Sequence, residues 1–331
     1  MNKISVMRFA IWRLSSIGDI INTMPAVDAL KKQFPDCEIA YIAKKQFAGL
    51  LQHKKNINKI IPFDTKKESL LSIFKRLREF EPDYFIDLHK TYRSFIVKAL
   101  LAFHLPKAKI MSINRRSLLK EFLVRRHFTQ PECSGLMSAR FLEPLTGLIP
   151  GISTAAVPVR IDRPANIAKQ KSIGISPRSN WFTKDLSFNQ LLEIINSIPL
   201  NYKVILFGSA KDVQFNSRLC SAAERSIQDL TNTTTLAELV TKIAECSLVL
   251  APDSGIMHIA MALGVKTIAI FGPTCPKQFD FSQHYLIYTN EKCSPCHFYG
   301  EAKCHLGHHN CIKNIDISEI TRIISAECGV D

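Results

Sequence analysis

The chain has 331 residues and an apolar fraction of 46%, which is enough to build two hydrophobic cores of ordinary size. No apolar run approaches the roughly 18 residues that a membrane-spanning helix needs. The first ten residues lack the apolar stretch and cleavage site of a secretion signal, so we expect a cytoplasmic protein. Its ten cysteines are then expected to be thiols and not a disulfide framework.

The net charge of +14 belongs entirely to the first half of the chain. Residues 1–160 contain 27 Lys and Arg against 13 Asp and Glu, whereas residues 161–331 contain 16 of each kind. A basic face typically binds nucleic acid, anionic lipid or a phosphorylated substrate, although a merely basic surface gives the same count. A nucleic-acid-binding protein is the less favoured alternative, because no helix-turn-helix, RNA-binding aromatic motif or zinc-finger spacing accompanies the charge.

The first half alternates short apolar runs with helical patterns. Strands are predicted at residues 9–12, 38–43, 60–63 and 84–88. The first strand is followed by a loop over 13–19 and by a helix over 20–34. In a parallel sheet such a loop lies at the carboxyl edge, where ligands bind. Gly18 lets the backbone approach a ligand, and Asp19 stands where the helix begins, where the helix dipole alone also favours an acidic residue.

The pattern weakens between residues 133 and 161, where prolines cluster, and restarts in the second half. Further strands are predicted at residues 172–176, 203–207, 247–250 and 267–271. We therefore expect an N-terminal Rossmann-like domain over 1–160, a C-terminal one over 161–316, and a terminal helix within 317–331.

The stretch 251–274 is predicted to run from strand through turn and helix to a further strand. Asp253 and Ser254 precede Gly255, and His258 follows one helical turn after Ser254. A helix N-terminus at this edge favours a phosphate group, and Asp253 could accept hydrogen bonds from sugar hydroxyls. The alternative is that Asp253 and Ser254 only cap the helix and that His258 is a core histidine.

Two motifs resemble the ADP-heptose:lipopolysaccharide heptosyltransferases, glycosyltransferase family 9. Asp253-Ser-Gly-Ile-Met-His258, followed by Phe271-Gly-Pro-Thr274, is similar to the donor-site signature of that family, and residues 13–26 are similar to its opening loop. The resemblance implies the α/β fold called GT-B, in which two Rossmann-like domains face each other across a cleft. It also implies an inverting, metal-independent transfer of L-glycero-D-manno-heptose from ADP-heptose to the inner core of lipopolysaccharide, without a cofactor.

The resemblance also assigns roles to individual residues. It makes Asp19 the catalytic base. Donor-binding roles fall to Lys184, Asp212, Asp253, Ser254, Gly255 and His258. Acceptor-binding roles fall to Arg13, Ser15, Ser16, Arg93, Arg115 and Arg116. Two positions depart from the family pattern: Leu186 replaces an aromatic residue, and Cys275 replaces the usual Asp or Ser.

The implied partners are ADP-heptose and an acidic glycolipid, either Kdo-lipid A or inner-core lipopolysaccharide that already carries heptose. The basic first half suits the carboxylates and phosphates of such an acceptor, and we expect transient contact with the inner face of the inner membrane. The terminal helix is expected to return to the N-terminal domain, as it does in many two-domain glycosyltransferases. A related transferase or epimerase that uses another nucleotide sugar is the alternative among enzymes.

A cysteine cluster near the C-terminus has three possible explanations. Cys293 and Cys296 have the spacing of a metal knuckle, whereas Cys304 and Cys311 follow at less typical intervals. A structural zinc, ordinary reduced cysteines and disulfides all remain open, and no metal is assigned to catalysis. The cluster slightly favours a transferase of the second-heptose type.

Overall fold

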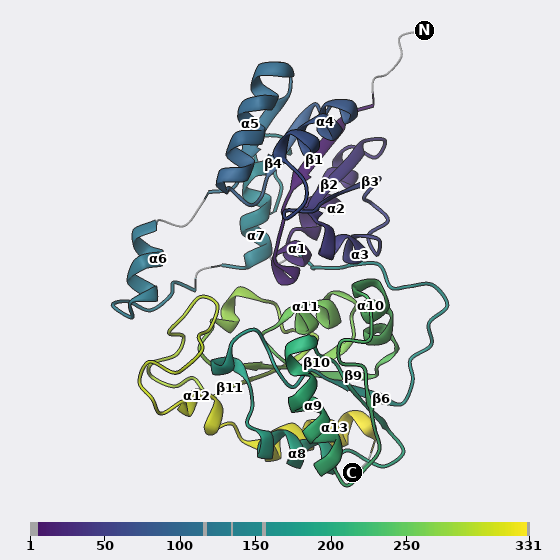
Figure 1. Cartoon of the computed structure of the whole chain (residues 1–331), viewed down its shortest axis with the longest axis vertical. Helices are drawn as coiled ribbons and strands as arrows, with labels where there is room; N and C mark the ends of the chain where they lie inside the picture. Colours follow the sequence, from purple (N-terminus) through teal and green to yellow (C-terminus); the bar gives the residue numbers. More distant parts are fainter. Residues whose placement is uncertain (1–5, 115–117, 134, 154–156, 330–331) are drawn as a thin grey trace. The chain divides into compact units, whose positions relative to one another are not determined.

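The computed structural model describes residues 6–114, 118–133, 135–153 and 157–329. They form two compact units, each built on one parallel sheet (Figure 1). The N-terminal unit is Met1–Arg115 with Gly135–Asp162, and the C-terminal unit is Arg116–Ser134 with Arg163–Asp331. The later junction lies close to the expected boundary. Residues 116–134 differ from the expectation, because they belong to the C-terminal unit.

The N-terminal sheet has the strand order β3-β2-β1-β4-β5, and all its neighbouring strands are parallel. Its strands are β1 (Arg8–Trp12), β2 (Glu38–Lys44), β3 (Lys59–Phe63), β4 (Tyr84–Asp87) and β5 (Lys109–Ser112). Its helices are α1 (Ile17–Asn22), α2 (Met24–Gln33), α3 (Ala48–Leu51), α4 (Leu70–Phe80), α5 (Tyr92–His104) and α7 (Met137–Leu142).

Strand β1 is apolar on both sides because helices cover both faces of the sheet. Ala10 and Trp12 point into a core with residues of α4 and α5. Phe9 points to the other face, where its ring lies 5.5 Å from that of Phe34, the residue after α2. The chain order reverses at β1, between β2 and β4, and ligands of such sheets bind at the carboxyl ends of the strands at this point.

The C-terminal sheet has the order β11-β10-β9-β6-β7-β8 and is also parallel throughout. Its strands are β6 (Ser172–Ile175), β7 (Lys203–Leu206), β8 (Ile227–Asp229), β9 (Leu248–Pro252), β10 (Lys266–Phe271) and β11 (Tyr285–Tyr288). Its helices are α6 (Leu118–Arg125), α8 (Phe188–Ser197), α9 (Val213–Ala222), α10 (Leu236–Glu245), α11 (Gly255–Ala262), α12 (Asn310–Lys313) and α13 (Ile317–Cys328). This order repeats that of the first sheet with one more strand, so the expectation of two Rossmann-like domains is confirmed.

The terminal helix α13 belongs to the C-terminal unit, which corrects the expectation that it returns to the N-terminal domain. Its residues Ile320 and Ile324 are fully buried in the same core as Ile194 and Ile195 of α8. Burial of this apolar stripe on the helix's own domain explains its position. Among the described residues, no helix has both the length and the apolar character needed to cross a bilayer.

A buried carboxylate shapes the loop at the carboxyl end of β4. Asp87 is fully buried, and its Oδ1 accepts hydrogen bonds from the backbone N–H groups of His89 and Lys90, at 3.0 and 2.7 Å. Its Oδ2 lies 3.0 Å from Nζ of Lys98 on α5. Because an unpaired charge is costly in the interior, this ion pair fixes the loop to α5.

We predict that Lys98→Met destabilises the N-terminal unit by about 3 kcal/mol, because it leaves the buried Asp87 charge without its partner. The measurement is urea unfolding in a Trp181→Phe background, in which Trp12 is the fluorescent reporter of this unit. Lys75→Met, at an exposed position of α4, is the matched control. Equal unfolding midpoints for the two variants would contradict the assignment.

Candidate active site

The loop between β1 and α1 holds the carboxylate of Asp19 in a fixed position. Its Oδ2 accepts hydrogen bonds from the backbone N–H and the hydroxyl of Ser16, at 3.1 and 2.9 Å. The same oxygen lies 2.6 Å from Nη2 of Arg13, whose Nη1 donates to the backbone oxygen of Leu88. Arg13 therefore ties the loop after β1 to the loop after β4, and the contacts on Oδ2 leave Oδ1 for another donor.

These contacts determine the charge of Asp19. Burial acts to raise the pKa of this carboxyl, but the Arg13 guanidinium and the Ser16 hydrogen bonds outweigh it and hold the pKa below its usual value. Asp19 is therefore ionised at neutral pH. A quarter of its side chain is exposed, so a ligand can reach it.

The other predicted acceptor residues have different surroundings. Ser15 is partly buried, and Ser16 is exposed and contacts Asp19. Arg93 lies in the first turn of α5, and its guanidinium carbon is 4.6 Å from the centroid of the Tyr92 ring. Arg115 and Arg116 lie outside the described residues.

His89 belongs to this site and was missed by the sequence analysis. Burial lowers its pKa to about 4, and the nearby Arg13 charge acts in the same direction, so the imidazole is neutral at pH 7. The carboxylates of Asp19 and Asp87 oppose this shift without reversing it. The signal in the sequence is a polar residue two positions after the end of β4, but only the sheet order shows that β4 lies beside β1.

In the C-terminal unit, Asp253 connects the ends of three strands. It directly follows β9, and its Oδ2 lies 3.2 Å from Nζ of Lys184, in the loop after β6. The same oxygen accepts a 2.8 Å hydrogen bond from the hydroxyl of Thr274, after β10. Nζ of Lys184 also donates to the backbone oxygen of Asp253. The structure thus brings together the predicted residues Lys184 and Asp253.

The charge of Asp253 follows from these contacts. Burial acts to raise its pKa, but the Lys184 ammonium and the imidazole of His258 hold it well below its usual range. Nε2 of His258 lies 3.6 Å from Oδ1 of Asp253. His258 therefore lies beside Asp253, and its role in donor binding stays a prediction.

Ser254 differs from its expected role as a helix cap. It is the residue before α11, but its side chain makes no capping hydrogen bond. In the described part of the chain its Oγ is buried without a hydrogen-bond partner. The first N–H groups of α11, beginning with Gly255, are therefore not satisfied by this hydroxyl, and an anion can take that place.

Asp212 serves the local backbone. Its Oδ2 accepts hydrogen bonds from the backbone N–H and hydroxyl of Ser209, at 2.8 and 2.7 Å, which caps the turn before α9. Its Oδ1 is buried without a partner among the described residues. This capping role explains why an acidic residue is buried here, and the explanation needs no contact with a donor substrate.

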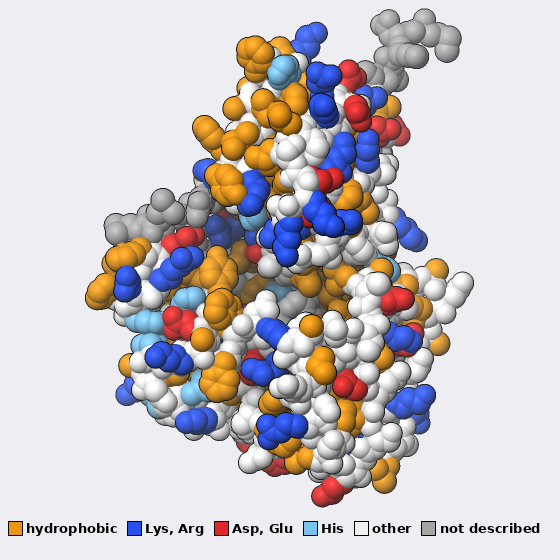
Figure 2. Space-filling model, in the orientation of Figure 1, with side chains coloured by type: hydrophobic (Ala, Val, Ile, Leu, Met, Phe, Trp, Pro, Cys, Tyr) orange, Lys and Arg blue, Asp and Glu red, His pale blue; other side chains and the backbone are white. Residues whose placement is uncertain are grey.

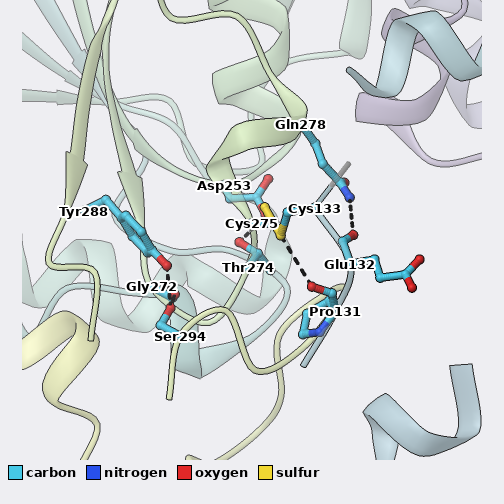
Figure 3. The surroundings of a disulfide bond; sticks show 10 residues. All are labelled: Pro131, Glu132, Cys133, Asp253, Gly272, Thr274, Cys275, Gln278, Tyr288 and Ser294. Carbon is cyan, nitrogen blue, oxygen red and sulfur yellow. Dashed lines mark hydrogen bonds between the residues drawn. A yellow bond between two sulfur atoms is a disulfide. The ribbon is translucent and has the colours of Figure 1, made fainter. Parts of the chain in front are cut away.

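A disulfide joins Cys133 to Cys275 beside Asp253 and Thr274 (Figure 3). This is a correction to the expectation that the cysteines are all thiols. The bond attaches the end of segment 116–134 to the loop after β10. The amide of Gln278 also donates to the backbone oxygen of Glu132, at 3.3 Å, so the segment is held at two neighbouring points.

The four cysteines of the C-terminal cluster are not joined by disulfides. Cys293, Cys296, Cys304 and Cys311 form no disulfide, so that alternative is wrong. Burial raises the pKa of Cys296 to about 12, and the charges of the other three sulfur atoms add to the shift. Burial raises the pKa of Cys311 to about 12 as well, with contributions from Cys293 and Cys304. The four thiols are thus close enough to affect one another.

Comparisons with known proteins agree with this geometry. The model of glycosyltransferase family 9 (heptosyltransferase) matches residues 70–305. Lipooligosaccharide heptosyltransferase 2 of Campylobacter jejuni serotype O:6 is 25% identical over 315 residues, covering 90% of this chain and 92% of that protein. OpsX, a lipopolysaccharide core heptosyltransferase of Haemophilus influenzae, is 25% identical over 280 residues. This match covers 79% of this chain and 78% of that protein. The structure of the E. coli ADP-heptose lps heptosyltransferase II has a similar fold, with a TM-score of 0.75 at 18% identity and 98% coverage of both chains.

The matched region includes most of the chain and contains Lys184, Asp253 and His258. The fold, the two strand-end sites and the family match lead to the same conclusion. The chain belongs to glycosyltransferase family 9, the heptosyltransferases, and is a glycosyltransferase.

Proposed function

We propose that this enzyme transfers L-glycero-D-manno-heptose from ADP-heptose to the inner core of lipopolysaccharide. The observation that carries the proposal is the pair of ligand-facing strand ends, one with an ionised carboxylate and one with a lysine beside a helix N-terminus. The relatives support the substrates, since C. jejuni heptosyltransferase 2 and OpsX act on lipooligosaccharide or lipopolysaccharide by name. The E. coli enzyme of similar fold is named for ADP-heptose.

Asp19 is the proposed general base. Its ionised carboxylate keeps Oδ1 for the acceptor hydroxyl, while Arg13 and Ser16 fix Oδ2. The hydroxyl oxygen attacks the anomeric carbon as its proton passes to Asp19, and the bond from that carbon to ADP breaks. This single displacement inverts the anomeric configuration. Proton removal of this kind typically contributes 10²–10⁴-fold to the rate.

The C-terminal strand ends are proposed to hold the donor. Negative charge grows on the diphosphate as the sugar leaves, and the Lys184 ammonium and the N-terminus of α11 can stabilise it. Because these groups supply positive charge, we propose that the reaction needs no catalytic metal. Asp253 orients Lys184 through the ion pair and, with His258, can bind hydroxyls of the heptose.

The acceptor is proposed to be inner-core lipopolysaccharide that already carries a first heptose, because several relatives are named heptosyltransferase 2. Lysine and arginine side chains are numerous on the face of the N-terminal unit drawn in Figure 2, and they suit Kdo carboxylates and lipid phosphates. Each basic residue near anionic lipid contributes about 1 kcal/mol to membrane binding. We therefore propose a peripheral position on the inner face of the inner membrane.

Asp19→Asn is predicted to lower kcat by about 10²–10⁴-fold, because the amide cannot take the acceptor proton. Donor affinity, measured by calorimetric titration with ADP-heptose, should stay within about twofold because no donor contact is assigned to Asp19. Asp36→Asn, at an exposed turn before β2, is the matched control and should retain full activity. Retention of kcat in the Asp19 variant would remove it from the catalytic role.

Arg13→Met is predicted to move the acid limb of the kcat profile to higher pH. The wild-type pKa of Asp19 is lowered chiefly by Arg13 against the effect of burial, so the carboxyl of the variant takes up its proton at a higher pH. The measurement is kcat between pH 4 and 8, about the range in which carboxyl and imidazole groups titrate, with circular dichroism at each pH to verify folding. Arg13→Lys, which keeps a positive charge, should shift the limb less, and an unchanged limb in Arg13→Met would contradict the assignment.

Lys184→Met is predicted to weaken ADP binding by about 10- to 100-fold, the loss expected for one charged hydrogen bond of about 1.5–3 kcal/mol. Thermal stabilisation by ADP, UDP and GDP measures both affinity and nucleotide choice, and the wild type should respond selectively to ADP. Lys203→Met, at the exposed start of β7, is the control. Equal ADP responses in both variants would exclude Lys184 from the donor site, and a response to UDP or GDP alone would exclude ADP-heptose.

A further inference from the structure

A long irregular segment connects β11 to α12, between Tyr288 and Asn310. It runs through the yellow-green end of the chain in Figure 1 and contains no helix or strand. Connections of this length without secondary structure are uncommon in compact domains and are usually functional or held by other means. Three cysteines lie in this segment, and Cys311 follows in the first turn of α12.

The four thiols surround one small cavity inside the C-terminal unit. Its volume is ≈ 10 Å³, and Cys293, Cys296, Cys304 and Cys311 all line it. A space of this size accommodates about one water-sized sphere. Cys311 is buried, the other three are partly buried, and none of the four is in a disulfide. The cavity is therefore a single-atom space with sulfur from four positions in its wall.

We propose that Cys293, Cys296, Cys304 and Cys311 bind one thiophilic divalent cation, Zn²⁺ or Fe²⁺, as a structural centre. Four cysteine ligands are typical of such ions in tetrahedral sites, and the Cys293-x-x-Cys296 spacing is that of a metal knuckle. Binding replaces four thiol protons with one cation, so the protons are released to solvent.

The neighbouring histidines are less suitable as the primary ligands. Nε2 of His309 is 2.9 Å from the backbone oxygen of Thr183, and Nδ1 of His308 accepts a 3.0 Å hydrogen bond from the N–H of Asn310. Each of these two rings therefore already has a hydrogen-bond partner. Histidine side chains are visible as a group on the C-terminal unit in Figure 2.

Among the described residues, one group of possible ligands has all its ligand atoms within 4.8 Å of one another, and it consists of His127, Glu301 and His305 and not of the thiols. Nε2 of His127 lies 3.1 Å from the Glu301 carboxylate, and its ring stacks on that of His305 at 3.8 Å. We assign the cation to the thiols because four cysteines with a Cys-x-x-Cys pair are a typical ligand set for these ions, and we make the His/Glu group the competing outcome.

The centre would support the donor site, and this consequence depends on the proposed function. The N–H of Cys296 donates to the backbone oxygen of Pro273, 2.9 Å away and next to Thr274. The hydroxyl of Thr183, the neighbour of Lys184, donates to the backbone oxygen of Glu301, also at 2.9 Å.

Close packing at Gly300 strengthens the same connection. Its φ is +94°, and a Cβ there would lie 2.8 Å from Cβ of Trp181 and 3.2 Å from Cγ of Lys184. A cation that fixes segment 293–311 would therefore also restrain the loops that carry Lys184 and Thr274.

The test is the metal content of the full-length protein, expressed in medium supplied with zinc and iron and purified without chelators. Elemental analysis by mass spectrometry should find one zinc or iron per chain, and the element present distinguishes the two ions. Reconstitution with Co²⁺ in place of the native ion should give the absorption bands of thiolate ligands.

Matched variants test whether the four thiols, and not other groups of the unit, bind the metal. Cys296→Ser and Cys304→Ser should lose the stoichiometric metal, while Cys220→Ser, a free cysteine on α9, should keep it. Cys296→Ser should also be cleaved faster by protease within residues 293–311. Circular dichroism and the unfolding midpoint verify that each variant still folds, including α13 and its core. Loss of metal is then not confused with unfolding.

Two results would overturn the proposal. One is a wild-type chain without stoichiometric zinc or iron that also gives no thiolate band with Co²⁺. The other is metal retained in Cys304→Ser but lost in His127→Ala, which would assign the cation to the His/Glu group. Neither readout depends on heptose transfer, so failure of the proposed function would leave this test intact.

Discussion

The proposed donor edge depends on the ion pair between Lys184, which is buried, and Asp253, which is partly buried. A carboxylate that is largely removed from water is costly unless it is paired and hydrogen-bonded, and Asp253 satisfies both conditions with groups from different strand ends. Lys184 comes from the loop after β6, and Thr274 from the loop after β10. The ion pair and the Thr274 hydrogen bond together fix three loops of the C-terminal sheet. The lysine of the pair then lies next to the start of α11.

The N-terminal edge uses the same chemistry for a different purpose. Arg13 and Ser16 hold one oxygen of Asp19 and keep the carboxylate ionised. Low basicity is the consequence, so if Asp19 is the base, as we propose, its rate advantage comes from its position. In the proposed mechanism, Lys184 and the start of α11 stabilise the negative charge that grows on the leaving diphosphate. The division of labour agrees with the charge count, since the first half carries the whole excess of positive charge.

Both strand-end motifs were predictable from the sequence because each consists of neighbouring residues. Asp253 and His258 lie five residues apart, and Arg13, Ser16 and Asp19 lie within seven consecutive residues. Residues brought in by topology were harder to predict: His89 joins Asp19 only because β4 lies beside β1. Thr274 belongs to a motif that the sequence shows, but its hydrogen bond to Asp253 could not be predicted from that motif.

Other features depend on tertiary contacts that no local pattern encodes. The Cys133–Cys275 disulfide joins positions 142 residues apart in the sequence. Segment 116–134 belongs to the C-terminal unit, although the chain on both sides of it belongs to the N-terminal unit. Helix α13 has an apolar stripe that suits either domain, and its packing on α8 could not be chosen from the stripe alone. Ser254 has the sequence position of a helix cap, yet its hydroxyl makes no cap.

The most direct test of the account is transfer itself, with the product examined by mass spectrometry and NMR. Purified enzyme is incubated with ADP-heptose and either Kdo-lipid A or the same acceptor carrying one heptose. We predict one added heptose on the heptosylated acceptor, release of ADP, and an anomeric configuration opposite to that of the donor. Retention of configuration would contradict direct displacement assisted by Asp19, and no transfer to either acceptor would contradict the proposed substrate.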